Sequence, residues 1–484
     1  MMPGQKTRSA TVRARLDHPV IDGDGHTVEL MPLIFDYLEE TGGKKVLERY
    51  IAGLHKPWYD MSRHQRRQER VIRPGFWSLS PNALDRATVT LPALFRERMD
   101  EMGLDFAILY TSFGLNMLQI QDDEIRRVGC RALNTMYADM FDSHADRMTV
   151  PALIPMHTPE EALDELDHAV NKLGMKAITI GTCVRRPIAA AASASPELAR
   201  YAAWWDVLGC GSDYNYDAVW QKCIDLRVVP TSHDRSIGWG ARTSPENHCF
   251  NHIGHFAAAS EAFCKGLVFG GVPHRFPTLK FAFLEGGVAW ACSLYNDLIA
   301  HWEKRNLDAL HRNLDPSKLD REAFAELFLK YGGKLAQRRP DAITGPLHSS
   351  YGLRPTTESP DDLDDWSAAG VETAEDFARF FDNFFFGCEG DDRVSAVAFN
   401  PKLNAFGAKM HAFFSSDIGH WDVPDITATV AEAYELVEDG LLTDEDFRNF
   451  TFTNVVRMYT AMNPDFFKGT TVEPAVREIM TTVV

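Results

Sequence analysis

Short apolar runs alternate with longer amphipathic segments along most of this chain. The short runs are rich in β-branched and aromatic residues, as buried strands are, and the longer segments repeat apolar positions at helical spacing. The expected strands lie at 20–26, 105–110, 148–153, 176–181, 227–233, 279–285, 384–389 and 411–417, and the clearest helices at 122–144, 159–173, 216–226 and 247–270.

This alternation of strands and helices predicts parallel strands joined by right-handed crossovers. Eight strand–helix units predict an α/β fold of the (β/α)8 TIM-barrel type. A doubly wound open sheet is the alternative, but no G-x-G-x-x-G follows the first strand to support a dinucleotide site.

Three segments are too long to be simple loops of a barrel. They lie at 41–90, 182–215 and 300–383. Because structureless loops of this length are uncommon in compact folds, we expect insertions over the barrel, largely helical, that form a lid and contacts between subunits. The chain 1–484 is therefore expected to be a single TIM-barrel domain that assembles as a homodimer.

The composition and charge narrow the class of ligand. A hydrophobic content of 45% with 24% charged residues is typical of a globular protein. The formal net charge of −18 argues against a nucleic-acid partner, because phosphates are bound by clustered Lys and Arg. The basic run from Arg63 to Arg70 is the local exception, and a solvated helix face or a subunit contact explains it. We expect a small-molecule substrate.

The cysteines and the N-terminus indicate the compartment. The eight cysteines include no C-x-x-C pair and read as reduced core residues. No apolar stretch of signal-peptide type follows the basic N-terminal residues, and no uncharged apolar run reaches membrane-spanning length. We therefore expect a cytoplasmic protein without a membrane partner.

Metal-competent side chains stand at the ends of several predicted strands. In the first strand Asp24 and His26 are two residues apart, so both point the same way and could form half of a metal site. An Asp/Gly turn that happens to contain a histidine is the alternative. His233, Glu285 and Asp417 also follow strands, on the face where barrel active sites are built.

Several of these motifs resemble one enzyme family. The D-x-D-x-H of the first strand, the strand-end His233, the Phe-Leu-Glu-Gly-Gly-Val-Ala-Trp run and the final Ser-Ser-Asp-x-x-His are similar to motifs of the amidohydrolase superfamily. More narrowly they resemble the amidohydrolase-related branch that includes aminocarboxymuconate-semialdehyde decarboxylase and the resorcylate-type decarboxylases. The resemblance covers most of the chain apart from the three insertions.

The resemblance implies one divalent metal ion. Carried over residue by residue, its ligands are Asp24, His26, His233 and Asp417. Mixed imidazole and carboxylate ligands suit zinc, which we expect, with manganese or another first-row ion as the alternative. Asp22 is then a candidate for orienting a metal-bound imidazole through a contact with the ring on the side away from the ion. Lys176 begins the fourth strand instead of ending it, so no bridging lysine supports a second ion.

The chain departs from the decarboxylase branch at the sixth strand. That branch places a histidine where this chain has Glu285. A replacement acid or base could be Glu285 itself, or His252 or His255, which are three apart and share one side of a continuous helix; we select His255. Asp417 is expected to work on the same proton.

Three candidate functions follow from this set. The first is a hydrolase that attacks a small carboxylated or cyclic substrate with metal-activated water. The second is a non-oxidative decarboxylase of an aromatic or unsaturated carboxylate, and the third is an inactive barrel used for binding. Hydrolysis is preferred because the family's proton donor is replaced. Arg185 and Arg186 are expected to hold a substrate carboxylate, with a surface pair before Pro187 as the alternative. Trp239 is expected to line the pocket, with a plain core position as the alternative.

Overall fold

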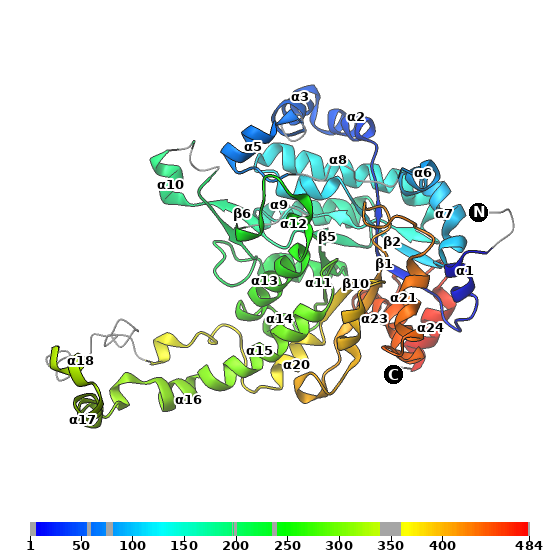
Figure 1. Cartoon of the computed structure of the whole chain (residues 1–484). Coiled ribbons are helices and arrows are strands. Elements are labelled where there is room, and N and C mark those ends of the chain that lie inside the picture. Colours follow the sequence, from blue (N-terminus) through cyan, green and yellow to red (C-terminus); the bar gives the residue numbers. More distant parts are fainter. Residues whose placement is uncertain are drawn as a thin grey trace.

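Parallel strands form the centre of the molecule, and helices surround them (Figure 1). The computed structural model describes residues 6–55, 60–73, 81–195, 197, 201–234, 240–338 and 360–482. All eight predicted strand positions are confirmed, although the third is divided in two. The parallel strands are β1 (Ile21–Thr27), β2 (Phe106–Thr111), β3 (Met148–Thr149), β4 (Ala152–Leu153), β5 (Ile178–Ile180), β8 (Pro230–Ser232), β9 (Phe281–Phe283), β10 (Phe384–Glu389) and β11 (His411–Ser415).

A proline divides the third strand position. Val150 and Pro151 separate β3 from β4, and proline has no backbone N–H to donate to a neighbouring strand. The two halves pair on opposite sides: β3 lies parallel to β2, and β4 lies parallel to β5. Together they occupy one position in the ring of strands.

The strands close on themselves. Hydrogen bonding gives the orders β1-β2-β3 and β4-β5-β8-β9-β10-β11, with every pair parallel. The free edges of β1 and β11 meet where the Asp417 N–H donates to the Asp24 carbonyl (3.1 Å) and the His26 N–H donates to the Ile418 carbonyl (2.7 Å). With β3 and β4 counted as one position, eight parallel strands complete a TIM barrel.

The helices follow the predicted alternation. The longest, α8 (Asp123–Phe141), is capped by the side chain of Asp122 and buries one stripe that includes Ile125 and Leu133. The other helices around the barrel are α1 (Arg8–Arg13), α2 (Met31–Gly42), α7 (Pro92–Met102), α9 (Pro159–Leu166), α11 (Asp217–Leu226), α12 (His248–His252), α13 (His255–Phe269), α14 (Val272–Arg275), α15 (Ala289–Arg305), α21 (Thr429–Glu438), α22 (Asp444–Arg448), α23 (Asn454–Met462) and α24 (Glu473–Thr482).

The predicted insertions contain local structure of their own. The first contains α3 (Lys44–Tyr50), α5 (Arg63–Glu69) and α6 (Ala83–Thr90). The second is an antiparallel hairpin of β6 (Val184–Pro187) and β7 (Ala203–Asp206) that carries α10 (Ala189–Ala194). The third contains α16 (Leu307–Ala309), α17 (Arg321–Tyr331), α18 (Gly333–Arg338) and α20 (Asp376–Phe381).

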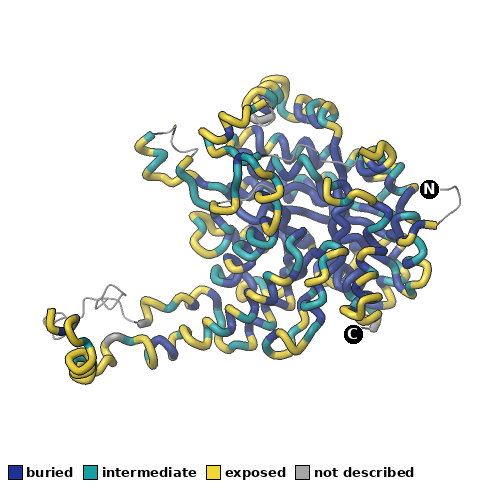
Figure 2. The backbone as a smooth tube through the Cα atoms, viewed as in Figure 1, coloured by how far each residue is buried: buried dark blue, intermediate teal, exposed yellow. Residues whose placement is uncertain are grey.

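The third insertion forms an arm. Figures 1 and 2 show α16, α17 and α18 extending away from the barrel with mostly exposed backbone, and α17 contains no buried residue. Its role as a lid or as a subunit contact stays a prediction, as does the assignment of the whole chain to one domain.

Two expectations on composition can be compared with the fold. All eight cysteines are free; six are buried as expected, but Cys210 and Cys249 are exposed. Within the described residues, no helix combines the length and apolar character needed to cross a bilayer.

Candidate metal centre

The first strand brings Asp24 and His26 to the carboxyl-terminal end of the barrel. Gly23 allows the neighbouring strand to approach, because a Cβ there would meet the ring of Phe413 on β11. A Cβ at Gly25 would collide with the Asp22 carboxylate of the same strand, 2.5 Å away, and would lie 3.2 Å from Ser416 Oγ. This close approach holds β1 against β11, so that Asp24 and His26 face residues that follow β11.

Asp22 does not orient an imidazole, contrary to the sequence-based expectation. A bulge between Asp22 and Gly25 breaks the two-residue alternation of β1. The Asp22 carboxylate instead accepts hydrogen bonds from Ser416 N (3.0 Å), Ser416 Oγ (2.5 Å) and Asp24 N (3.2 Å). Asp22 therefore joins the ends of β1 and β11 beneath the site.

His233 follows β8 and is fixed in one orientation. Its Nδ1 lies 2.7 Å from the backbone carbonyl of Asp234, which requires a proton on Nδ1. The lone pair of Nε2 then points into the barrel mouth, where it lies 3.3 Å from Nε2 of His26. This distance between two imidazole nitrogens is compatible with both nitrogens binding one cation.

Glu285 and Asp417 follow β9 and β11 with unusual backbones. Their φ angles are 56° and 50°, in the left-handed region that non-glycine residues rarely adopt. Such conformations cost on the order of 1–3 kcal/mol and cluster at functional sites. The turn after β11 also needs Gly419, at φ 106°, because a Cβ there would meet the backbone of His26.

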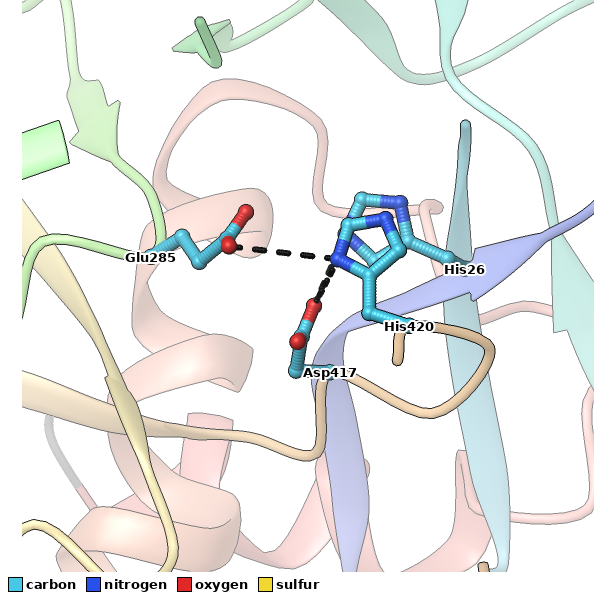
Figure 3. A group of neighbouring side chains, drawn as sticks. All are labelled: His26, Glu285, Asp417 and His420. Carbon is cyan, nitrogen blue, oxygen red and sulfur yellow. Dashed lines mark ion pairs between the residues drawn. The ribbon is translucent and has the colours of Figure 1, made fainter. Parts of the chain in front are cut away.

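Six side chains converge at this end of the barrel, four of which appear in Figure 3. His26 Nε2 lies 3.4 Å from Asp417 Oδ1 and 3.7 Å from Asp24 Oδ1. His233 Nε2 lies 3.1 Å from Glu285 Oε2. Ligands of one tetrahedral ion at about 2.1 Å are roughly 3.4 Å apart, so these separations are those of neighbouring ligands. The six side chains form two overlapping groups that share His26: Asp24, His26 and His233, and His26, Glu285, Asp417 and His420.

His420 completes the cluster. Its Nδ1 lies 2.6 Å from Asp417 Oδ1 and 3.8 Å from Glu285 Oε1, and its ring stacks on that of His26 with centroids 3.8 Å apart (Figure 3). The contact with Asp417 is short but is not aligned as a hydrogen bond, since both oxygens of Asp417 lack a hydrogen-bond partner. His420 belongs to the Asp-x-x-His motif, but the sequence analysis gave it no role.

The electrostatics of the cluster are unfavourable without a cation. Burial, and then the neighbouring carboxylates, raise the pKa values of Asp24, Glu285 and Asp417 well above their usual range. Burial also lowers the pKa of His26 well below its usual value and that of His233 to about 3, so both imidazoles are neutral at pH 7. Neutral imidazoles and crowded carboxylates are the forms that ligate divalent metals.

The donor set fits a divalent ion by a second criterion. Asp24 Oδ1, both oxygens of Glu285 and both of Asp417 are buried and have no hydrogen-bond partner. Buried acceptors without donors are rare in folded proteins and call for an ion or water. The expected ligands are thus brought together, and Glu285 joins them; that they bind metal stays a prediction.

The residues expected to bind substrate are placed less favourably. Arg186 donates to Asp206 Oδ2 (2.5 Å), the His157 carbonyl (2.9 Å) and the Tyr216 hydroxyl (2.8 Å), so its guanidinium fixes the β6–β7 hairpin and is not available as a substrate clamp. Arg185 is half-buried on β6, opposite Trp205. Trp239 lies outside the described residues.

The helical histidines separate into two environments. Gly254, at φ 71°, breaks the expected helix between α12 and α13, so His252 and His255 do not share a face. His252 Nε2 lies 3.9 Å from Glu285 Oε1, whereas His255 Nε2 lies 3.4 Å from Asp234 Oδ2. His252 is therefore the helical histidine beside Glu285, whereas His255, the residue selected from the sequence, lies beside Asp234.

A family comparison agrees with this geometry. Residues 92–328 match the family model described as amidohydrolase. This segment is similar to amidohydrolases, and the resemblance indicated by the sequence motifs is confirmed. The matched segment contains His233 and Glu285, and the barrel brings Asp24, His26 and Asp417 to them from outside it.

Several solved structures are similar to this chain, and the one with the highest TM-score of the three named here shares its fold. An amidohydrolase from Mycobacterium avium subsp. paratuberculosis is 15% identical, covering 92% of this chain and 100% of its own, with a TM-score of 0.50. A 2,6-dihydroxybenzoate decarboxylase from Rhizobium is 13% identical over 92% and 99%, with a TM-score of 0.47. A dihydroxybenzoic acid decarboxylase from Polaromonas, holding manganese and 2-nitroresorcinol, is 13% identical over 93% and 99%, with a TM-score of 0.48.

Proposed function

We propose that this enzyme is a metal-dependent carboxy-lyase that removes CO₂ from an aromatic or unsaturated carboxylate without oxidation. The observation that supports the proposal is the crowding of the Asp24, Glu285 and Asp417 carboxyl groups in one buried site. Their combined charge exceeds that of one divalent ion, so burial favours a proton kept on one of them.

Decarboxylation needs that proton. When the bond between the carboxyl carbon and the ring or alkene carbon breaks, CO₂ leaves, the electron pair stays on the remaining carbon, and one proton replaces the lost group. Asp417 lies 2.6 Å from His420 and can deliver this proton, and the neutral imidazole of His420 can then relay a proton from water back to Asp417.

The metal would be held by Asp24, His26, His233 and Asp417, with Glu285 as a further ligand. When bound, a divalent ion supplies positive charge that anchors the substrate anion and offsets charge developing during the reaction. Zinc is the ion expected from the sequence. The added carboxylate of Glu285 makes the site harder, and manganese is then at least as well suited.

The sequence favours hydrolysis only because Glu285 replaces a family histidine, and this reason does not hold in the folded protein. His420 brings an imidazole to the same cluster from the loop after β11, within 3.8 Å of Glu285. An imidazole that could relay a proton to Asp417 therefore lies beside the cluster, although the residue on the sixth strand has changed.

Hydrolysis remains the second candidate because of one observation. Burial lowers the pKa of His420, which leaves its imidazole neutral and able to accept a proton from water beside Asp417. Decarboxylation uses the same pair in the opposite direction, as an acid.

The two candidates differ in their products. Purified protein loaded with Mn²⁺ or Zn²⁺ is incubated with hydroxylated benzoates and unsaturated carboxylates while CO₂ release is recorded, and separately with lactones and amides. We expect CO₂ release that Asp417→Asn abolishes. Lactone or amide cleavage without CO₂ release from any carboxylate would replace the proposal with the hydrolase.

A further inference from the structure

A cavity lined by arginines lies between the first insertion and the loop that precedes α12. Its volume is about 370 Å³, and its lining residues are Arg63, Arg66, Arg73, Pro245 and Glu246. We name it the arginine pocket. Its lining thus contains three arginines and one glutamate, in a chain whose formal net charge is −18.

The basic run expected to be a solvated helix face forms one wall of this pocket. α5 begins with a capping box between Ser62 and Gln65, and Arg63 and Arg66, three residues apart, lie on one side of it. Arg66 is only 6% exposed and donates to the Ile72 carbonyl (3.0 Å). A buried arginine on a surface helix is not explained by solvation.

On the opposite wall of the pocket, Arg73 of the first insertion is hydrogen-bonded to the loop that precedes α12. Arg73 N donates to the Ser244 carbonyl (3.2 Å) and Arg73 Nη1 donates to the Glu246 carbonyl (2.8 Å). The Glu246 carboxylate pairs with Arg63 (3.4 Å) and with Arg67. Burial and the nearby charge of Arg73 lower the pKa of Arg66, as expected where guanidinium groups are crowded.

A buried side chain joins the arginine pocket to the metal centre. Asn251 is 1% exposed; its Nδ2 donates to the carbonyls of Arg73 (3.3 Å) and Ser244 (2.9 Å), and its Oδ1 accepts from Ser244 N (2.5 Å). The next residue, His252, lies 3.9 Å from Glu285. The arginine pocket is thus built onto the same short helix, α12, that borders the catalytic cluster.

We propose that the arginine pocket binds the carboxylate or phosphate group of a small molecule. Planar guanidinium groups bind such oxyanions through paired, charge-assisted hydrogen bonds. The anion is either a second anionic group of the substrate, with the rest of the molecule reaching the metal centre, or a separate small anion. The assignment rests on the pocket itself and does not depend on whether the enzyme releases CO₂.

The test measures binding to the full chain by titration calorimetry at constant ionic strength. The probes are inorganic phosphate and benzene-1,3-dicarboxylate. Arg66→Gln removes the buried guanidinium, and Arg63→Gln removes an exposed one with less risk to folding. Arg275→Gln is the matched control, because Arg275 forms a surface pair with Asp217 (2.8 Å) away from the pocket.

We expect saturable binding of at least one probe, weakened roughly 10-fold or more by Arg66→Gln, several-fold by Arg63→Gln, and unchanged in Arg275→Gln. If His233→Ala also weakens the dicarboxylate but not phosphate, the anion belongs to a substrate that reaches the metal centre; if it weakens neither, the anion is a separate ligand. Absence of binding to the wild type, or equal affinity in the wild type, Arg66→Gln and Arg63→Gln, overturns the proposal. An equal loss in Arg275→Gln also overturns it. If Arg66→Gln does not fold, Arg63→Gln decides.

Discussion

Glu29 and the pair Glu285 and Asp417 are equally buried carboxylates with opposite surroundings. Glu29, just beyond β1, accepts hydrogen bonds from the Thr111 hydroxyl, the Tyr137 hydroxyl (2.6 Å) and Phe113 N (2.9 Å). Both oxygens of Glu285 and both of Asp417 lack a hydrogen-bond partner. The Glu29 network joins the ends of β1 and β2 to α8, whereas the other two carboxylates face the barrel mouth.

This difference in hydrogen bonding distinguishes buried carboxylates that have a structural role from those that indicate a functional site. Burial raises the pKa of Glu29 as it does those of Glu285 and Asp417, so a raised pKa does not separate the two groups. The number of hydrogen-bond donors around each carboxylate does separate them. The fold provides donors for a structural carboxylate, whereas a carboxylate that binds a ligand or takes part in catalysis has none within the protein.

Removing two imidazoles should have the largest effect. His26→Ala combined with His233→Ala takes away both neutral nitrogens of the cluster, and metal affinity should fall by more than the roughly 10–100-fold that loss of an outer partner costs. Elemental analysis of purified protein should show close to one divalent ion per wild-type chain and almost none in the double variant. His301→Ala, on the exposed face of α15, is the control. Equal metal content in all three would end the metal hypothesis.

Asp417→Asn should lower turnover by a factor on the order of 10⁴, because Asp417 is expected both to bind the ion and to carry the proton. A matched control exists at the opposite end of the barrel, where Asp382 pairs with His411 at 2.9 Å. Asp382→Asn should leave turnover within about twofold of the wild type. Comparable losses in the two variants would mean that the Asp417–His420 pair is structural.

Glu285→Gln should lower turnover by a factor on the order of 10²–10³, with metal content retained through the four remaining ligands. Glu285→His restores the residue of the decarboxylase branch and should keep or raise CO₂ release from a carboxylated aromatic. Turnover of Glu285→Gln at the wild-type level would assign Glu285 a structural role and leave the proton to Asp417 and His420.

In the metal-free protein, substitutions of the two kinds of carboxylate should change the free energy of unfolding in opposite directions. Glu29→Gln leaves donors poorly matched and should lower the free energy of unfolding by about 1–3 kcal/mol without changing metal content. Glu285→Gln removes a crowded buried charge and should leave stability unchanged or raise it. Denaturant unfolding after chelation gives both values, and a loss of stability in both variants would show that Glu285 is also held by the fold.

Ser416→Ala should have the smallest effect. It removes the hydroxyl donor to Asp22 but keeps the backbone N–H, so the free energy of unfolding should fall by about 1 kcal/mol. Turnover should change little, because Asp22 contacts no ligating imidazole. A large loss of metal in Ser416→Ala would show that the Asp22 network holds Asp24 in place after all.

The parts that the sequence predicts well are those governed by local periodicity. Apolar runs predict every strand position of the barrel, although not β6 and β7. Strand ends predict that Asp24, His26, His233 and Asp417 come together, because parallel strands present their carboxyl ends on one face. The third strand is divided at Pro151, which has no backbone N–H. The sequence shows this proline, but it does not show which strands pair with the two halves.

The parts that the sequence does not predict depend on turns and on distant contacts. His420 reaches the cluster through left-handed backbones at Asp417 and Gly419. His252 and His255 separate because Gly254 ends one helix and begins the next. Arg186 is occupied by Asp206 across a hairpin that the strand pattern does not show.

The contact between β1 and β11 also determines when the site can exist during synthesis. Asp24 emerges from the ribosome long before Asp417, and the strands that carry them are joined by the hydrogen bond between Asp417 N and the Asp24 carbonyl. A nascent chain that has emerged only to His233 carries two histidines and one carboxylate of the set but has no last strand to close the ring. The metal binding that we expect therefore has to wait until β11 and Asp417 have been synthesised, and a translation product abandoned before that point has no finished site in which to trap an ion.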